Sequence, residues 1–196
     1  MAAIPKPLAL ALRDLYDIRY AVETGTYKMW STAWLAEEFL HVWTIEMDEK
    51  HYQGAIRRSG EFPNVKFMHG DSRQVLPEAL AELDAPALLW LDAHWCGGAS
   101  PDTPPEYECP LEAELRAVRA NVEATGRHHF IFIDDARCFM GRPEYPHRIE
   151  EWPSLTHIIA LAPPGYVVDV YQDAIICLPA FAAPVALAWR IAPCAS

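Results

Sequence analysis

The stretch Ala87-Leu-Leu-Trp-Leu-Asp92 is a run of five apolar residues that ends in an aspartate. A second run, His129-Phe-Ile-Phe-Ile133, ends in the same way at Asp134-Asp135. Short apolar runs without polar interruption are typical of strands buried on both faces, as in parallel sheets. We therefore predict two central strands of a parallel sheet, each with a carboxylate at its carboxyl end.

Outward from these runs, strand and helix patterns alternate. Earlier strands are predicted at 20–23, 41–47 and 65–69, and helices at 7–18, 29–39, 49–58, 73–83 and 111–123. Residues 156–161 and 166–178 are predicted as two late strands joined by a turn at Pro163-Pro164-Gly165. This order predicts an α/β fold: a Rossmann-like, doubly wound, mostly parallel sheet with an antiparallel C-terminal hairpin.

The length of 196 residues predicts a single domain that spans 1–196. An N-terminal helix is expected within 1–19. Residues 96–110 and 138–153 hold many of the prolines and are predicted as loops that wall an active site. The apolar tail 180–196 is compatible with a helix, a strand or a partner surface.

The charge excludes two classes of partner. Against 27 Asp and Glu stand 16 Lys and Arg, which gives a net charge of −11. Nucleic acid and anionic membrane surfaces require clustered basic residues, so neither is expected as the main partner.

We find no signal-peptide pattern and no apolar run near the roughly 18 residues of a membrane span. The expectation is a cytoplasmic protein with a small-molecule substrate, and a homo-oligomer is left open.

Acidic residues follow nearly every predicted strand. They are Glu23, Glu46, Asp71, Asp92 and the pair Asp134-Asp135. In open α/β sheets the ligands bind in a crevice at the carboxyl ends of the strands. The sequence therefore predicts one acidic crevice, which suits a cationic ligand, a metal ion or sugar hydroxyls.

Five segments that contain these acidic residues resemble a known protein family. Three of them, Val22-Glu-Thr-Gly-Thr-Tyr27, Thr44-Ile-Glu-Met-Asp48 and Gly70-Asp-Ser72, resemble the nucleotide-binding side of class I S-adenosylmethionine (SAM)-dependent methyltransferases. Two others, Leu91-Asp-Ala-His-Trp95 and Ile133-Asp-Asp-Ala-Arg137, resemble the metal side of the Mg²⁺-dependent, macrocin-type O-methyltransferases. The resemblance covers about residues 20–178.

The resemblance implies SAM as the cofactor. The residues that would bind it are Glu23, Thr24, Gly25, Thr26, Tyr27, Glu46, Asp71, Ser72 and Asp92. Other interpretations stay open. A carboxylate at Glu46 serves the ribose of NAD as well as that of SAM. Asp71 and Ser72 are also strong helix N-cap residues. Glu23 would either bind the amino group of the methionine moiety or form a hydrogen bond that stabilises the fold.

Asp92, Asp134 and Asp135 are the predicted metal ligands. Three neighbouring carboxylates repel one another unless they are neutralised, and Mg²⁺ prefers oxygen ligands. By the resemblance, Asp134 is also a general-base candidate, and His94 is the second catalytic candidate. The alternative is that one aspartate caps a helix while another pairs with Arg137.

Together these features predict SAM-dependent, metal-assisted methyl transfer to a hydroxyl of a small molecule, as in natural-product modification. Two alternatives remain. One is an NAD-dependent oxidoreductase, although the loop after residue 23 lacks G-x-G-x-x-G. The other is a non-catalytic SAM-binding or assembly protein that uses the tail 180–196 as its partner surface.

Overall fold

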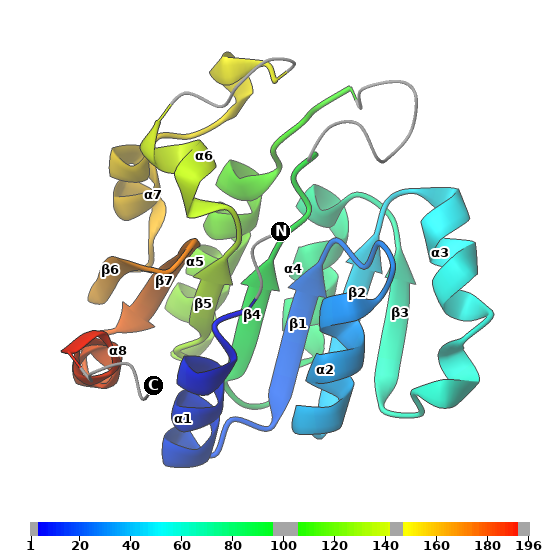
Figure 1. Ribbon diagram of the computed structural model, residues 1–196, viewed down its shortest axis with the longest axis horizontal. Helices are drawn as coiled ribbons and strands as arrows, with labels where there is room; N and C mark the ends of the chain where they lie inside the picture. Colours follow the sequence, from blue (N-terminus) through cyan, green and yellow to red (C-terminus); the bar gives the residue numbers. More distant parts are fainter. Residues whose placement is uncertain (1–3, 96–105, 142–146, 192–196) are drawn as a thin grey trace.

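A computed structural model of the chain has one central sheet with helices on both faces (Figure 1). It describes residues 4–95, 106–141 and 147–191. The strands are β1 (Tyr20–Thr24), β2 (His41–Glu46), β3 (Val65–His69), β4 (Ala87–Leu91), β5 (Phe130–Ile133), β6 (Tyr166–Tyr171) and β7 (Ala174–Pro179). Their order in the sheet is β3-β2-β1-β4-β5-β7-β6. Strand β7 runs antiparallel to β5 and β6, whereas the other pairs are parallel. The predicted fold class is confirmed.

The helices connect the strands across both faces. They are α1 (Lys6–Tyr16), α2 (Trp30–Glu38), α3 (Glu49–Ile56), α4 (Ser72–Glu82), α5 (Leu111–Thr125), α6 (Ala136–Met140), α7 (Leu155–Leu161) and α8 (Ala183–Ile191). Two short 3₁₀ turns, η1 (Ser59–Glu61) and η2 (Ile149–Glu151), complete the described structure. Within the described ranges, no helix combines the length and apolar character that crossing a membrane requires.

Strand β4 shows how the two cores form. All five of its residues are buried, and alternate side chains point to opposite faces. Leu88 and Trp90 join the core under α1, α2 and α8. Leu89 and Leu91 join the core under α4, α5 and α7. In Figure 1, α1, α2 and α8 accordingly lie in front of the sheet and α4 and α5 behind it.

The late part of the chain differs from the prediction. The strand predicted at 156–161 is wrong, because Leu155–Leu161 forms α7. The side chain of Ser154 caps this helix by accepting a hydrogen bond from the His157 backbone N–H, and Ile158 is buried. This cap and the burial of one helical face outweigh the β-branched pair Ile158-Ile159.

The C-terminal hairpin exists, but its turn is elsewhere. Predicted strand 166–178 is two strands, β6 and β7, in which Tyr171 pairs with Ala174. Gln172 takes a positive φ of 56° in the turn between them. The turn predicted at 163–165 instead connects α7 to β6.

The predicted loops and tail contain helical structure. Part of 138–153 belongs to α6 and η2, and 142–146 lies outside the described residues. Of the predicted loop 96–110, only 106–110 is described. Most of the apolar tail 180–196 is α8, which lies against α1.

Candidate cofactor and active site

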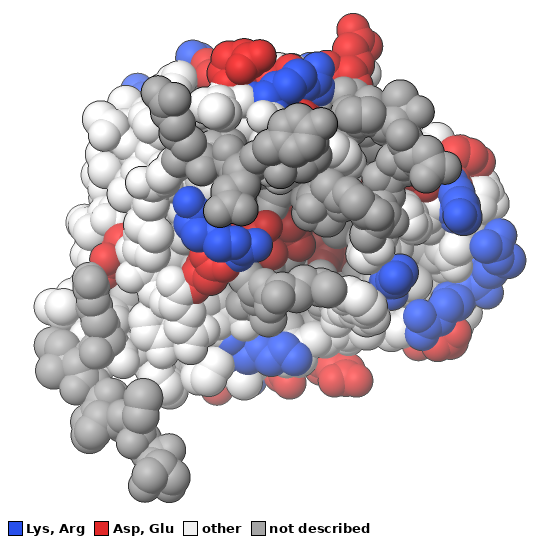
Figure 2. All heavy atoms as spheres, turned by 45° about the horizontal axis from the view of Figure 1, so that its top comes forward, with Lys and Arg blue, Asp and Glu red and all other residues white. Residues whose placement is uncertain are grey.

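A cavity of about 850 Å³ opens at the carboxyl ends of β1, β2 and β4. The strand order reverses between β1 and β4, and ligands of open α/β sheets bind at such a point. Acidic side chains gather in the hollow of this face (Figure 2). Ten of the twelve predicted site residues line the cavity: Gly25, Thr26, Tyr27, Glu46, Asp71, Ser72, Asp92, His94, Asp134 and Asp135.

The loop after β1 is held tightly against β4. Gly25 has a φ of 87°, and a Cβ added to it would lie 2.2 Å from the carbonyl oxygen of Asp92. Tyr27, two residues later, also has a positive φ, of 45°. A non-glycine residue in this region carries strain of order 1–3 kcal/mol, which the surrounding contacts must offset.

Glu46 connects this loop to β2. Its Oε2 accepts a hydrogen bond from the Tyr27 backbone N–H at 2.7 Å, and its Oε1 accepts one from the Asp48 backbone N–H at 2.8 Å. A carboxylate offers about four acceptor sites. Each oxygen of Glu46 therefore keeps a lone pair for a ligand in the cavity.

Glu23 and Thr24 do not line the cavity but lie beneath it. Glu23 is fully buried, and its Oε2 accepts hydrogen bonds from the hydroxyls of Thr32 and Thr44 at 2.5 and 2.6 Å. Burial raises the pKa of Glu23 to about 7. The Thr24 carbonyl oxygen accepts the Asp92 backbone N–H at 3.0 Å. In this arrangement both residues stabilise the fold around the cavity.

Asp71 and Ser72 form one side wall. Asp71 caps α4 by accepting the Arg73 backbone N–H at 2.9 Å. Although burial opposes ionisation of the carboxyl group, hydrogen bonding to Arg73 lowers the pKa of Asp71. The Arg73 guanidinium also lies 4.8 Å from the ring centroid of Tyr107. The capping role left open by the sequence is therefore present, and Ser72 still faces the cavity.

The three aspartates after β4 and β5 have different surroundings. Burial, together with the charges of Asp134 and Asp135, raises the pKa of Asp92 well above its ordinary value. Burial and the charge of Asp135 raise the pKa of Asp134. Among the described residues, the buried Oδ1 of Asp134 has no hydrogen-bond partner. A positive or hydrogen-donating ligand would relieve both groups.

Asp135 is already neutralised. Its carboxylate lies 3.0 Å from His94 Nε2 and 2.7 Å from Arg137 Nη1. Burial opposes ionisation, but these partners lower the pKa of Asp135 to about 2. Arg137 also pairs with Asp173 on the turn between β6 and β7. The pairing of one aspartate with Arg137, which the sequence left open, is thus present.

The arrangement of these carboxylates does not form a metal cage. In the described ranges, no three His, Cys, Asp or Glu side chains come together in a group that could hold a metal ion. The donor types suit a hard divalent cation, but the side chains of His94 and Arg137 already contact the Asp135 carboxylate.

His94 is enclosed at the base of the cavity. Its side chain is 4% exposed, and its ring makes edge contacts with the rings of Trp152 and Phe139 at centroid distances of 5.2 and 6.1 Å. Burial opposes protonation, but the hydrogen bond to Asp135 raises the pKa of His94.

Several functional candidates were absent from the sequence-based prediction. Lys6, Lys28, Trp30, Arg73 and Tyr107 also line the cavity. Lys28 directly follows Tyr27 in the loop after β1, so its place in the sequence could have indicated that it lines the cavity. Lys6 reaches the cavity only because α1 lies across the sheet, and no local pattern indicates that contact.

Two buried acids also escaped prediction. Glu114 is 1% exposed on the inner face of α5, beside Leu111 and Leu115. An acid on the apolar face of a helix is a readable signal. Glu108 is 1% exposed in the segment before α5, where no periodic pattern could reveal it.

No protein-family model matches the chain, and no curated protein matches it. Solved structures do. A Bacillus cereus O-methyltransferase with bound S-adenosylhomocysteine (SAH) is 19% identical, with a TM-score of 0.60 over 90% of this chain and 81% of that chain. The Streptomyces achromogenes O-methyltransferase TomG, involved in tomaymycin synthesis and solved with SAM, is 19% identical, with a TM-score of 0.57 over 91% and 81%. A Podospora anserina methyltransferase with bound SAH is 16% identical, with a TM-score of 0.57 over 91% and 79%.

These identities are low, so the likeness concerns the backbone. It agrees with the strand order and with the antiparallel β7 described above. The chain has the fold of the class I SAM-dependent methyltransferases.

Proposed function

We propose that the protein transfers the methyl group of SAM to a hydroxyl of a small molecule. One observation carries the proposal: the loop after β1, which contains Gly25, and the Glu46 side chain share a single cavity with the three aspartates that follow β4 and β5. The first pair suits a nucleoside, and the aspartates suit a reacting hydroxyl and a positive sulfonium. The likeness to methyltransferases that hold SAM or SAH supports this assignment.

The cofactor half of the site follows from the lone pairs that remain free. Glu46 would accept hydrogen bonds from the two ribose hydroxyls while it keeps its backbone donors. Gly25 would let the backbone approach the methionine moiety, because it has no side chain. Asp71 or Ser72, which both line the cavity, would meet the adenine edge.

The acceptor half requires a base. Methyl transfer forms a bond between the acceptor oxygen and the methyl carbon and breaks the bond from that carbon to sulfur, which leaves neutral SAH. The hydroxyl proton goes to Asp134, whose raised pKa and free Oδ1 suit it as acceptor. His94, fixed on Asp135, would orient the acceptor beside it.

Metal assistance is a separate part of the proposed chemistry and has its own requirements. The donor types of Asp92, Asp134 and Asp135 fit Mg²⁺, which would lower the pKa of a bound hydroxyl. Because Asp135 pairs with His94 and Arg137, such an ion would compete with these side chains. None of the steps above requires this ion.

The alternatives fit less well. NAD-binding Rossmann domains have the strand order 3-2-1-4-5-6, whereas this sheet inserts an antiparallel β7 between β5 and β6. An assembly protein without catalysis would not need a buried oxygen atom without a hydrogen-bond partner, Asp134 Oδ1, beside a cavity of this size, since such an atom costs stability.

Calorimetry on the full chain tests the proposal. SAH is expected to bind with a Kd in the micromolar range and NADH not at all; the reverse result would contradict it. A second titration adds Mg²⁺ to the wild type and to Asp134→Asn. Saturable binding only to the wild type supports metal assistance, and no binding to either removes it. A hydroxyl-compound screen with product mass analysis then identifies the acceptor, seen as a gain of one CH₂.

A further inference from the structure

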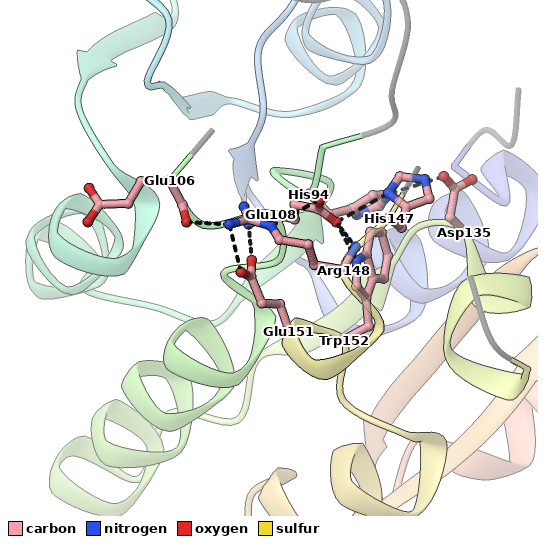
Figure 3. A network of polar contacts seen from close by, with 8 residues as sticks. All are labelled: His94, Glu106, Glu108, Asp135, His147, Arg148, Glu151 and Trp152. Atoms are coloured by element: carbon pink, nitrogen blue, oxygen red, sulfur yellow. Dashed lines mark hydrogen bonds and ion pairs between the residues drawn. The ribbon is translucent and has the colours of Figure 1, made fainter. Parts of the chain in front are cut away.

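A buried carboxylate outside the cavity joins the segment that precedes α5 to the segment that precedes α7. The carboxylate of Glu108 accepts three hydrogen bonds from the second segment (Figure 3). The donors are the Arg148 backbone N–H at 2.9 Å, Arg148 Nε at 3.2 Å and the Trp152 indole Nε1 at 3.1 Å. His147 Nδ1 lies 3.4 Å away.

Further contacts of these residues complete the connection. The Glu108 backbone N–H donates to Glu151 Oε2 at 2.6 Å. Arg148 Nη1 donates to the Glu106 carbonyl oxygen at 3.0 Å and pairs with Glu151 Oε1 at 3.0 Å. We call these five residues, Glu106, Glu108, Arg148, Glu151 and Trp152, the Glu108 clasp.

The clasp holds a fixed geometry. Although burial opposes ionisation, hydrogen bonds from Arg148 and Trp152 lower the pKa of Glu108, so it remains a carboxylate. Charge-assisted hydrogen bonds are directional, and a network of them defines the relative position of its members. The segment that carries Glu108 lies outside the helices and strands, so these bonds hold it in place, together with the hydrogen bond that the Trp95 backbone N–H donates to the Glu108 carbonyl oxygen at 2.8 Å.

The clasp reaches the active site at two points. Glu106 and Tyr107, next to Glu108, line the cavity. The Trp152 ring, whose N–H is bound by Glu108, packs at 5.2 Å from the His94 ring and at 5.3 Å from the Phe139 ring. His94 therefore has Trp152 and Phe139 against its ring and Asp135 at its Nε2.

We propose that Glu108 is a positioning residue of the active site. By orienting Trp152, it keeps the His94 ring on Asp135. It also fixes the position of Glu106 and Tyr107, which form the side of the cavity where the methyl acceptor would bind. The positioning of His94 stands on the contacts alone. The consequence for catalysis rests on the proposed function.

Nuclear magnetic resonance of ¹⁵N-histidine-labelled full-length protein tests the positioning directly. The variants are Glu108→Gln, which keeps the shape and removes the charge, and Trp152→Phe, which keeps a smaller aromatic ring and removes the indole N–H. The His94 ring signal, assigned by its loss in His94→Gln, is expected to shift or split in both variants. Glu112→Gln is the matched control, because Glu112 forms an exposed ion pair with Arg116 on α5; it should leave the signal unchanged.

The functional readout separates positioning from general stability. In both clasp variants, SAH affinity should stay within about twofold, whereas kcat for the acceptor should fall about 10- to 100-fold, the cost of displacing a catalytic group by about an ångström. An unchanged His94 signal in Glu108→Gln overturns the proposal, as does an equal loss of SAH affinity and kcat in either variant. If Glu108→Gln does not fold, the comparison of SAH affinity with kcat in Trp152→Phe decides, because that substitution changes the ring beside His94 and shifts the His94 signal in any case. If the wild type binds no SAH, the proposed function fails, while the His94 signal still reports on the clasp.

Discussion

Gly25 and Asp92 meet at the ends of β1 and β4, where a Cβ on Gly25 would lie 2.2 Å from the Asp92 carbonyl oxygen. The contact brings the loop that follows β1 against the strand that carries the first acidic residue of the proposed acceptor site. Since Gly25 also has a positive φ, both the space and the backbone conformation require glycine at this position.

Replacement of Gly25 by alanine should therefore displace the loop or the end of β4. We expect Gly25→Ala to lower the free energy of unfolding by about 2 kcal/mol or more and to weaken SAH binding at least about tenfold. Denaturant unfolding and calorimetry measure the two effects. Gly60→Ala is the control, because no atom lies within 4 Å of its added Cβ. A Gly25→Ala protein with normal SAH affinity would show that this approach does not serve the cofactor.

The Glu46 carboxylate provides a second test of the cofactor half. Glu46→Gln keeps one carbonyl oxygen but presents an NH₂ group to one of the backbone N–H groups of Tyr27 and Asp48. Loss of hydrogen bonds to a charged group costs about 1.5–3 kcal/mol, so SAH should bind about 10- to 100-fold more weakly. Glu61→Gln, at an exposed ion pair with Arg58, should leave the Kd unchanged. Binding of SAH to Glu46→Gln with the wild-type Kd would remove the ribose assignment.

Buried Glu23 should make the stability depend on pH. Burial raises its pKa from 4.5 to about 7, so the folded state binds the proton more tightly than the unfolded chain. The resulting stabilisation is full below about pH 4.5 and is lost as the pH rises to about 7, a total of about 3 kcal/mol. Glu23→Gln has no such titration, and its stability relative to the wild type should increase over this interval.

Denaturant titrations at several pH values between 4.5 and 8.5 measure that difference. Glu37→Gln, at an exposed position of the same region of the chain, should follow the wild type at every pH. A constant difference between wild type and Glu23→Gln would mean that Glu23 is ionised throughout in the folded protein.

The cap of α7 can be tested separately from the cavity. Ser154→Ala removes the acceptor of the His157 backbone N–H, a hydrogen bond of 3.3 Å. N-cap losses of this kind cost about 1 kcal/mol, or about 2–4 °C in Tm for a chain of this size. Calorimetric melting should show this decrease with SAH affinity unchanged, whereas Ser59→Ala, which caps no helix by its side chain, should melt like the wild type. An equal Tm for both variants would contradict the role of the cap.

The sequence determined the sheet and its acidic edge. Apolar runs such as 87–91 must be buried on both faces, which requires helices above and below a parallel sheet. Once the strands are parallel, their carboxyl ends share one edge, so residues far apart in sequence, such as Glu46 and Asp134, necessarily approach the same crevice. This geometric necessity explains why ten of the twelve predicted residues line one cavity.

Local pattern failed where two signals competed. Residues 156–161 contain a β-branched pair, but Ser154 and the burial of Ile158 beside α5 give a helix instead. Propensity is a weak local preference, and tertiary packing routinely overrides it.

Only the tertiary structure decided how the charges pair. The sequence placed Asp92, Asp134 and Asp135 together, but the pairing of Asp135 with His94 and Arg137 depends on side-chain directions set by the segment after β4 and by α6. The Glu108 clasp likewise joins residues about forty positions apart, and no periodicity records such a contact. Burial can be predicted from the sequence because hydrophobicity is a property of each residue by itself. A hydrogen bond between distant side chains, by contrast, exists only after folding has fixed both backbones.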